Sequence, residues 1–186
     1  TLPTFADAKE MLESGLIDAL LVSVPHYDHP KYAMMTMEAG IHVLIEKPAG
    51  VYTKQVLEMN ECAKKHDVVF GIMMNQRTNC IYRKMREIVK SGELGAIKRT
   101  NWLITNWYRP QAYYDSGAWR ATWSGEGGGV LLNQCPHNLD LWQWICGMPE
   151  AVYASCETKY HDIQVEDAVR ILARFPGGAT GSFTTS

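Results

Sequence analysis

Short apolar runs alternate with helical patterns through the first 75 residues. Apolar residues fill 19–24, 42–45 and 68–73, and each run has the length of a strand. Between them, Pro30 to Gly40 and a segment beginning at Thr53 carry residues that start and stop helices. Another helix is expected to end at Gly15. Continuous apolar strands separated by helices predict a parallel sheet covered on both faces.

The pattern changes after about residue 76. A helical stripe closes at Gly92, and a long strand is expected from Ile97 to Tyr108. An irregular aromatic stretch (113–123) and a glycine run then precede one helix ending near Gly147. Strands are expected at 151–160, 167–175 and 180–185. Runs of strands without alternating helices predict an α+β domain with a largely antiparallel open sheet. We therefore expect two domains, residues 1–75 and 76–186.

Polar clusters follow each strand of the expected parallel sheet. Ligands bind beyond the carboxyl ends of the strands in open sheets of this kind. Those ends carry Pro25-His26, Glu46-Lys47 and Asn75. Lys47 stands between a strand end and a proline, which disfavours a helical conformation for it. These residues predict a ligand-binding edge, although a surface lysine paired with Glu46 is the ordinary alternative for Lys47.

In the second half, Gly127-Gly128-Gly129 leads into a run that carries Asn133 and His137. Residues four apart share one face of a helix. A histidine exchanges a proton near neutral pH, and a neighbouring amide can orient it. The glycines either turn the chain or let the backbone approach a ligand closely. Lys47 and His137 are the predicted proton-transfer pair, with a histidine bonded to a backbone carbonyl as the alternative for His137.

Composition excludes several classes of function. The 186 residues are 46% hydrophobic and 20% charged, with a net charge of −2, which is typical of a soluble globular protein. The mixed charges argue against a nucleic-acid or membrane-surface partner, and no apolar run approaches the ~20 residues that span a bilayer. Five cysteines without a CxxC pair predict free thiols in the cytoplasm.

A metal site is not predicted. His26 and His29 are three residues apart, but no third ligand has convincing spacing. His26 is expected to line a cofactor. His29 either lines the cofactor as well or has a structural or capping role beside Pro30.

Taken in order, these motifs resemble those of the Gfo/Idh/MocA oxidoreductases, the family of glucose–fructose oxidoreductase and inositol dehydrogenase. Pro25-His26-x-x-His29 follows one strand and Glu46-Lys47-Pro48 the next, and the glycine run precedes Asn133, His137 and Asp140, with a distal Gly-x-Pro. The resemblance covers nearly the whole chain. It implies a Rossmann domain followed by a domain whose open sheet forms a homodimer or homotetramer. It also implies hydride transfer between NAD or NADP and a hydroxyl or keto group of a sugar, cyclitol or related polyol.

The resemblance also implies roles for single residues. Lys47 and His137 match the catalytic lysine and histidine of the family, and Lys47 is expected to contact the substrate as well. Asn133 and Arg120 are expected to bind the substrate. The residues expected to bind the cofactor are Pro25, His26, His29, Glu46, Lys47 and Asn75.

The chain departs from the family pattern in two respects. Many members carry Asp at the position of Asn133, and a neutral amide accepts no proton at neutral pH. Lys47 and His137 are therefore left to move the proton. The family also begins with a strand and a G-x-G-x-x-G turn, which this sequence lacks, so we interpret the chain as an internal fragment. The alternative function is a non-catalytic protein of the same fold that binds a dinucleotide or sugar for regulation.

Overall fold

The structure, a computed structural model, describes residues 2–104 and 108–186. The chain divides into two compact units, Thr1–Met73 and Met74–Ser186. The division lies two residues before the boundary expected after residue 75, so Asn75 belongs to the second unit. Each unit is described by itself.

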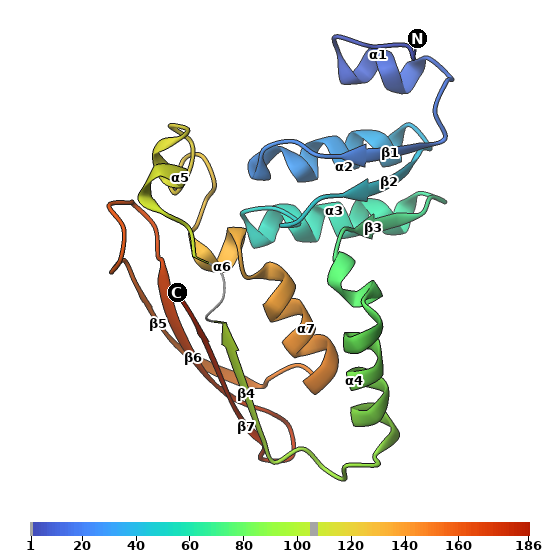
Figure 1. The fold of residues 1–186 in the computed structure, drawn as a ribbon. Helices are drawn as coiled ribbons and strands as arrows, with labels where there is room; N and C mark the ends of the chain where they lie inside the picture. The colour runs from blue at the N-terminus through green and yellow to red at the C-terminus, as the bar shows by residue number, and fades with distance from the viewer. Residues whose placement is uncertain (1, 105–107) are drawn as a thin grey trace. The chain divides into compact units, whose positions relative to one another are not determined.

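The first unit contains a three-stranded parallel sheet in the order β1-β2-β3 (Figure 1). The strands are β1 (Ala19–Val22), β2 (His42–Ile45) and β3 (Phe70–Ile72), and the helices are α1 (Ala8–Glu13), η1 (His26–Asp28), α2 (His29–Glu38) and α3 (Thr53–Lys65). The alternation of strands and helices follows the predicted order. The strands β1 and β3 are shorter than the apolar runs that predict them, because Pro25 and the bend at 66–68 lie close to the ladder.

Only one face of this sheet is covered in the part of the chain that the structure describes. Val43 and Ile45 are buried in a cluster with Met37 and Met59, which come from α2 and α3. Leu44 points the other way and is 37% exposed. The expectation of cover on both faces is therefore wrong for these residues, because α2 and α3 pack side by side on the same face (Figure 1).

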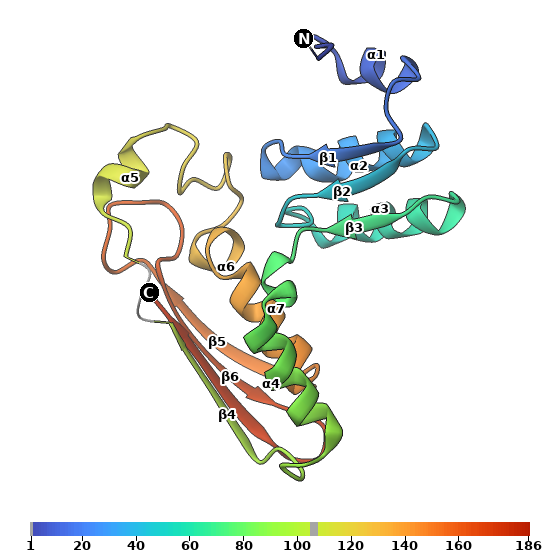
Figure 2. The same ribbon diagram turned by 45° about the vertical axis from the view of Figure 1, so that its right-hand side comes forward.

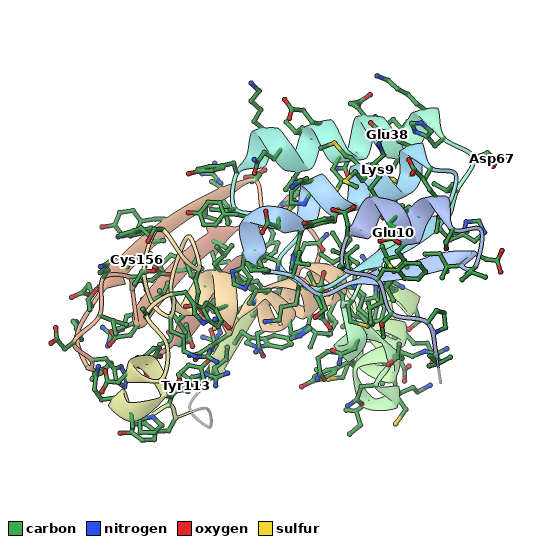
Figure 3. The ribbon with its side chains drawn as sticks, turned by 90° about the horizontal axis from the view of Figure 1, so that it is seen from above. Lys9, Glu10, Glu38, Asp67, Tyr113 and Cys156 are labelled. Atoms are coloured by element: carbon green, nitrogen blue, oxygen red, sulfur yellow. The ribbon has the colours of Figure 1, made fainter. Side chains whose placement is uncertain are left out.

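Helix ends follow the local chemistry of their residues. The Asp7 carboxylate accepts hydrogen bonds from the backbone N–H groups of Lys9 and Glu10, which lie in the first turn of α1 (Figure 3). In the second unit, Asn79 caps α4 (Cys80–Ser91) by accepting from the Ile81 N–H group. Gly92 ends that helix in the left-handed conformation, which glycine adopts without steric cost.

The second unit contains a four-stranded sheet in the order β4-β7-β6-β5. Its strands are β4 (Arg99–Ile104), β5 (Ala151–Glu157), β6 (Ala168–Arg174) and β7 (Thr180–Thr185). The pairs β5–β6 and β6–β7 are antiparallel, whereas β4–β7 is parallel, so the sheet is mixed but mostly antiparallel, as predicted. The expected strand from 97 to 108 ends at Ile104; 105–107 lie outside the described residues, and Tyr108 is not in a strand. The remaining elements are η2 (Asn75–Thr78), α5 (Gln111–Asp115), α6 (Val130–Asn133) and α7 (Pro136–Cys146).

The core of the second unit lies between α7 and one face of this sheet (Figure 2). The Trp142 ring on α7 lies 5.6 Å from the Phe175 ring and 5.7 Å from the Phe183 ring, centroid to centroid. Its indole N–H donates to Thr100 Oγ1 at 2.9 Å, which satisfies the polar end of a buried aromatic residue. A Cβ atom at Gly181 would stand 2.6 Å from Trp142, so glycine lets α7 approach β7 closely.

The prediction that a single helix carries Asn133 and His137 is wrong. The chain forms two helices there, and Asn133 ends α6 while His137 lies in the first turn of α7. Pro136 has no N–H group to donate to the carbonyl four residues earlier, and it occupies the first turn of α7. The Cys135 N–H group instead bonds to the Val130 carbonyl at 2.8 Å and closes α6. The short α5 also overlaps the start of the stretch 113–123, which was expected to be irregular.

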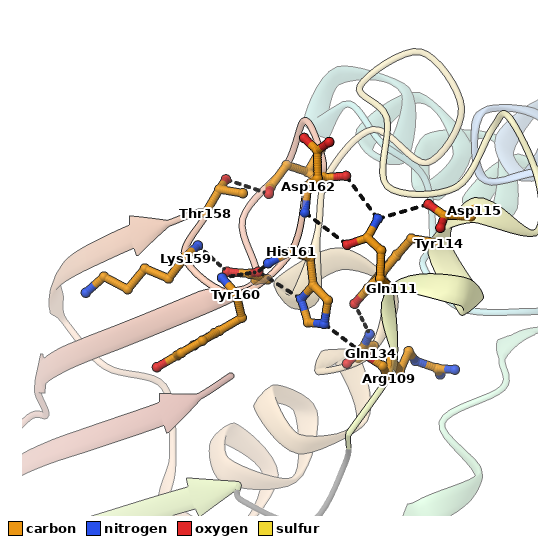
Figure 4. A network of polar contacts seen from close by, with 12 residues as sticks. Arg109, Gln111, Tyr114, Asp115, Gln134, Thr158, Lys159, Tyr160, His161 and Asp162 are labelled. Carbon is orange, nitrogen blue, oxygen red and sulfur yellow. Dashed lines mark hydrogen bonds and ion pairs between the residues drawn. The ribbon is translucent and has the colours of Figure 1, made fainter.

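One buried carboxylate organises the loop between β5 and β6 (Figure 4). Asp167 accepts backbone N–H groups from Lys159, Tyr160 and His161 at 2.7, 2.9 and 2.9 Å. The ring nitrogens of His161 lie 2.9 Å from the Asp167 carboxylate and 2.8 Å from the carbonyl oxygen of Arg109. Burial raises the pKa of Asp167, but the backbone N–H groups and the His161 ring outweigh it and leave the pKa below its usual value.

A carboxyl group with a depressed pKa in the folded state stabilises the fold above its unfolded pKa of about 3.9, and this stabilisation is lost as the pH falls through the folded value. We expect Asp167→Asn to lower the free energy of unfolding by about 1–3 kcal/mol at neutral pH. The loss should be smaller at pH 3, below the unfolded value, because the unfolded carboxyl then binds a proton and part of the pKa-linked stabilisation is gone. Urea denaturation at both pH values measures this difference, with exposed Asp162→Asn as the control. Equal losses of unfolding free energy at the two pH values would contradict the depressed pKa of Asp167.

Candidate functional site

The carboxyl edge of the first sheet carries the residues that were expected to bind the cofactor. The parallel register pairs Val22 with Ile45, so the segments after β1 and β2 leave the sheet at one edge. The Glu46 N–H group donates to the Val22 carbonyl at 2.9 Å, and the Lys47 N–H group donates to the Glu46 side chain at 3.2 Å. Pro25 is exposed there, whereas His26, Glu46 and Lys47 are half-buried. The Lys47–Pro48 peptide bond is cis.

His29 lies at the start of α2 and is buried, with 1% of its surface exposed. Its Nδ1 atom lies 2.6 Å from the Pro48 carbonyl oxygen, and its Nε2 atom lies 2.8 Å from the Val24 carbonyl oxygen. Both ring nitrogens therefore contact the backbone of the chain itself. Of the two predicted roles for His29, this geometry favours the structural one over contact with a cofactor.

The second unit contains a cavity of about 810 Å³ that brings His137 and Asn75 together. Its wall comes from η2, α4, β4 and α7. Inside the wall, the Trp102 indole N–H group donates to the Asn138 side-chain oxygen at 3.1 Å, which fixes an amide beside His137. The lining residues are Asn75, Gln76, Tyr82, Met85, Asn101, Trp102, Leu103, Ile104, His137, Asn138 and Leu141. A proton-exchanging histidine here has several amides as neighbours, which suits a ligand with hydroxyl groups.

An ion pair connects the two helical walls of this cavity. The Arg77 guanidinium in η2 donates two hydrogen bonds to the Asp140 carboxylate in α7, at 2.7 and 2.5 Å. The hydrogen bonds to Asp140 raise the pKa of Arg77. The same guanidinium lies 5.4 Å from the Trp144 ring, which Arg86 contacts at 4.7 Å. Because Asp140 follows His137 by three residues, the pair fixes η2 and Asn75 relative to the turn that carries His137.

Asn133 contributes to a different, smaller cavity, which Glu126, Gly129 and Glu166 also line. Its side-chain NH₂ group donates to the buried Glu126 carboxylate. The other Glu126 oxygen accepts the Ala121 N–H group at 2.7 Å and so supports a residue with a positive φ of 51°. The neutral amide at position 133 is thus bonded to a carboxylate that comes from the preceding loop.

Glu166 holds the glycine run in place. Its carboxylate accepts the N–H groups of Gly129 and Leu131 at 3.0 and 3.1 Å, and its carbonyl accepts that of Val130 at 2.9 Å. A Cβ atom at Gly129 would overlap the Glu166 backbone. Of the two predicted roles for the glycines, Gly127 turns the chain with a φ of 80°, while Gly129 permits close approach to the chain itself.

Arg120 is held by aromatic side chains. Its guanidinium donates to the Tyr113 hydroxyl at 2.6 Å and lies 4.3 and 4.5 Å from the centres of the Tyr113 and Trp119 rings. Arg109 lies 4.2 Å from the same Tyr113 ring. These contacts orient two positive charges around Tyr113, whose position is labelled in Figure 3. Arg120 is a predicted site residue, whereas Arg109, which contacts the same ring, was not predicted.

Glu166, Glu126 and the Arg77–Asp140 pair were also missed as structural groups around the site. No local sequence pattern marks Glu166, because its partners Gly129 and Leu131 lie 37 and 35 residues away in the chain. Within the described ranges, no three His, Cys, Asp or Glu side chains gather as a metal site requires. No helix in those ranges combines the length and apolar character needed to cross a membrane.

Comparison with known protein families covers almost the whole chain. Residues 1–74 match the description "Oxidoreductase family, NAD-binding Rossmann fold", and residues 82–186 match "GFO/IDH/MocA C-terminal domain". The chain belongs to the GFO/IDH/MocA family. The resemblance that the motifs of Lys47 and His137 indicated is therefore confirmed.

Relatives of this GFO/IDH/MocA protein include dehydrogenases and reductases. It is 26% identical to the trans-1,2-dihydrobenzene-1,2-diol dehydrogenase of Mus musculus, over 98% of this chain and 53% of the relative. It is 27% identical to the 1,5-anhydro-D-fructose reductase of Ensifer adhaerens, over 94% of this chain and 52% of the relative. A crystal structure shows the WlbA dehydrogenase from Bordetella pertussis in complex with NADH and UDP-GlcNAcA. The chain is 32% identical to that protein, over 98% of this chain and 52% of the other, and the two structures superpose with a TM-score of 0.89. The chain thus spans about half the length of the relatives it matches.

The Arg77–Asp140 pair can be tested by substitution. Asp140→Asn should lower the free energy of unfolding by about 1–3 kcal/mol, because it replaces a charged acceptor of two hydrogen bonds. The exposed Arg174–Glu150 pair gives the matched control, and Glu150→Gln should change stability by about 0–1 kcal/mol. Urea denaturation monitored by tryptophan fluorescence measures both. Equal effects of the two substitutions would show that the cavity wall does not depend on this ion pair.

Proposed function

We propose that the protein acts as an NAD(P)-dependent oxidoreductase on a hydroxyl or keto group of a sugar, cyclitol or related polyol. Membership of an oxidoreductase family carries this proposal. The sugar and diol enzymes among the relatives support the substrate class, and so does the amide-lined cavity around His137. The WlbA complex adds a nucleotide-linked sugar as a specific candidate within that class.

The residues present fit the nicotinamide end of NAD or NADP. The parallel register gathers the ends of β1 and β2 at one edge, where open α/β sheets bind their ligands. We propose that Pro25, His26, Glu46, Lys47 and Asn75 hold the cofactor. When bound, NAD(P) accepts a hydride from the carbon that carries the substrate hydroxyl.

Proton transfer falls to side chains of the protein. Lys47 and His137 are proposed to take the hydroxyl proton during oxidation and to return it during reduction. Lys47 also contacts the substrate oxygen. Asn133 and Arg120 are proposed to bind other polar groups of the substrate, and a guanidinium suits both hydroxyl and phosphate oxygens.

Lys47→Met tests the proton-transfer role. In the full-length protein it should lower kcat by roughly 10²-fold, the size expected for loss of a general acid–base group. Turnover is measured by NADH formation with myo-inositol, glucose and UDP-GlcNAcA as probe substrates. Lys54→Met, which removes an exposed lysine of the same unit, is the control and should leave kcat unchanged.

Unchanged kcat in Lys47→Met would remove Lys47 from the mechanism. If the wild-type protein instead binds NADH and a sugar without turnover, the non-catalytic regulatory function would replace the enzymatic one.

Self-association through the second sheet, as a homodimer or homotetramer, is part of the proposal. The face of this sheet opposite α7 presents Leu103, Tyr153 and Leu172, which are 67%, 72% and 61% exposed. The strand register places these three side chains on one surface. Exposed apolar side chains that share one sheet face support an interface there. The five free cysteines support a reducing compartment, for which we propose the cytoplasm.

Leu172→Glu should convert the full-length protein to monomers at micromolar concentration, because it buries a charge in the proposed interface. Multi-angle light scattering measures the mass of wild type and variant. Leu16→Glu replaces a leucine of similar exposure in the first unit and should leave the mass unchanged. A monomeric wild-type protein would contradict the oligomer.

A further inference from the structure

The segment that carries Lys47 begins where the strand ladder ends. The ladder between β1 and β2 ends with the bond from the Glu46 N–H group to the Val22 carbonyl. Beyond this point the backbone turns away from the sheet. A proton-transferring lysine nevertheless needs a fixed backbone, since a displacement of about 1 Å can cost ~10²-fold in rate.

His29 supplies a connection where the ladder ends. One ring nitrogen reaches the carbonyl of Pro48, the residue after Lys47, and the other reaches the carbonyl of Val24, just beyond the end of β1. The ring thus bridges the segments that follow two neighbouring strands. Its burial excludes water that would otherwise compete for these carbonyls.

A second contact seats the same segment on the same helix. A Cβ atom added to Gly50 would stand 2.8 Å from Pro30 Cγ and 3.2 Å from Val56 Cγ2. The absence of a side chain at Gly50 therefore lets the segment lie directly on the first turn of α2, next to His29. Two adjacent residues of α2, His29 and Pro30, hold the segment at Pro48 and at Gly50.

We propose that His29 is a positioning residue, which sets the place of Lys47 through its hydrogen bond to the Pro48 carbonyl. This inference rests on the proposed catalytic role of Lys47. In this role His29 acts through Lys47 and not by binding substrate or cofactor. The role differs from general stabilisation of the fold, because its effect on the rate must pass through the Lys47 side chain.

The test uses the full-length protein with His29→Leu and His29→Gln, each alone and combined with Lys47→Met. His29→Leu should lower kcat by about 10- to 100-fold. His29→Gln keeps one donor and should recover part of that loss. In the Lys47→Met background, His29→Leu should change kcat by less than about twofold, because residues that act through one another are not additive. The control is His66→Leu, which removes a half-buried histidine of the same unit whose ring bonds the Cys62 carbonyl.

Hydrogen exchange provides a readout that needs no enzymatic activity. His29→Leu should speed amide exchange in residues 46–51 while β1 and β2 keep their wild-type exchange. Gly50→Ala should have the same local effect, because it pushes the segment off Pro30. If His29→Leu does not fold, His29→Gln and Gly50→Ala provide the comparison.

The outcomes separate the two proposals. Absence of NAD-linked turnover in the wild type would overturn the proposed function, and the exchange data would still decide whether His29 holds the segment. Unchanged exchange in residues 46–51 would overturn the positioning role. So would a kcat loss from His29→Leu that is as large in the Lys47→Met background as in the wild type.

Discussion

The close approach of Gly129 to the Glu166 backbone is the constraint on which the second unit depends. It brings the start of α6 against the segment that leads into β6, and the Glu166 carboxylate then binds the N–H groups that α6 leaves open. Once α6 is fixed, Pro136 starts α7, which carries His137 toward the cavity and Trp142 into the core. A side chain at position 129 would push α6 away from the segment that leads into β6, and would displace α7 with it.

The elements of the fold could be predicted because their signals are local. Strand 42–45 has the bounds that its apolar run indicates, strand 180–185 follows the predicted turn at 176–178, and the helix closing at Gly92 ends where glycine predicts. The family motifs also placed Lys47 and the histidines correctly relative to the strands. The break between α6 and α7 was visible in the sequence as Pro136. The prediction of one helix followed the spacing of Asn133 and His137. It did not account for Pro136, which has no N–H group for the helical hydrogen bond.

The contacts that shape the site could not be predicted in the same way, because they join residues far apart in the chain. Arg77 and Asp140 are separated by 63 residues, and Gly129 and Glu166 by 37. Neither carboxylate has a distinctive local pattern. Whether a charged residue is solvated or closes an ion pair depends on which segment the fold brings to it. Asn133 illustrates this, since its sequence position suggested a substrate ligand and its bond to Glu126 emerged only from the fold.

The parallel pairing of β4 with β7 has a consequence for the order of folding. Asn101 and Ser182 face each other across this ladder but are 81 residues apart in the chain. During synthesis β4 leaves the ribosome long before its partner, while the hairpins β5–β6 and β6–β7 form from neighbouring segments. Long-range pairing of this kind forms slowly, because the entropy of closing the loop is lost before the contacts are gained. Trp102 and Ile104 therefore lack their partners Phe183 and Thr185 until β7 is made, and an unpaired strand edge of this kind is prone to aggregate.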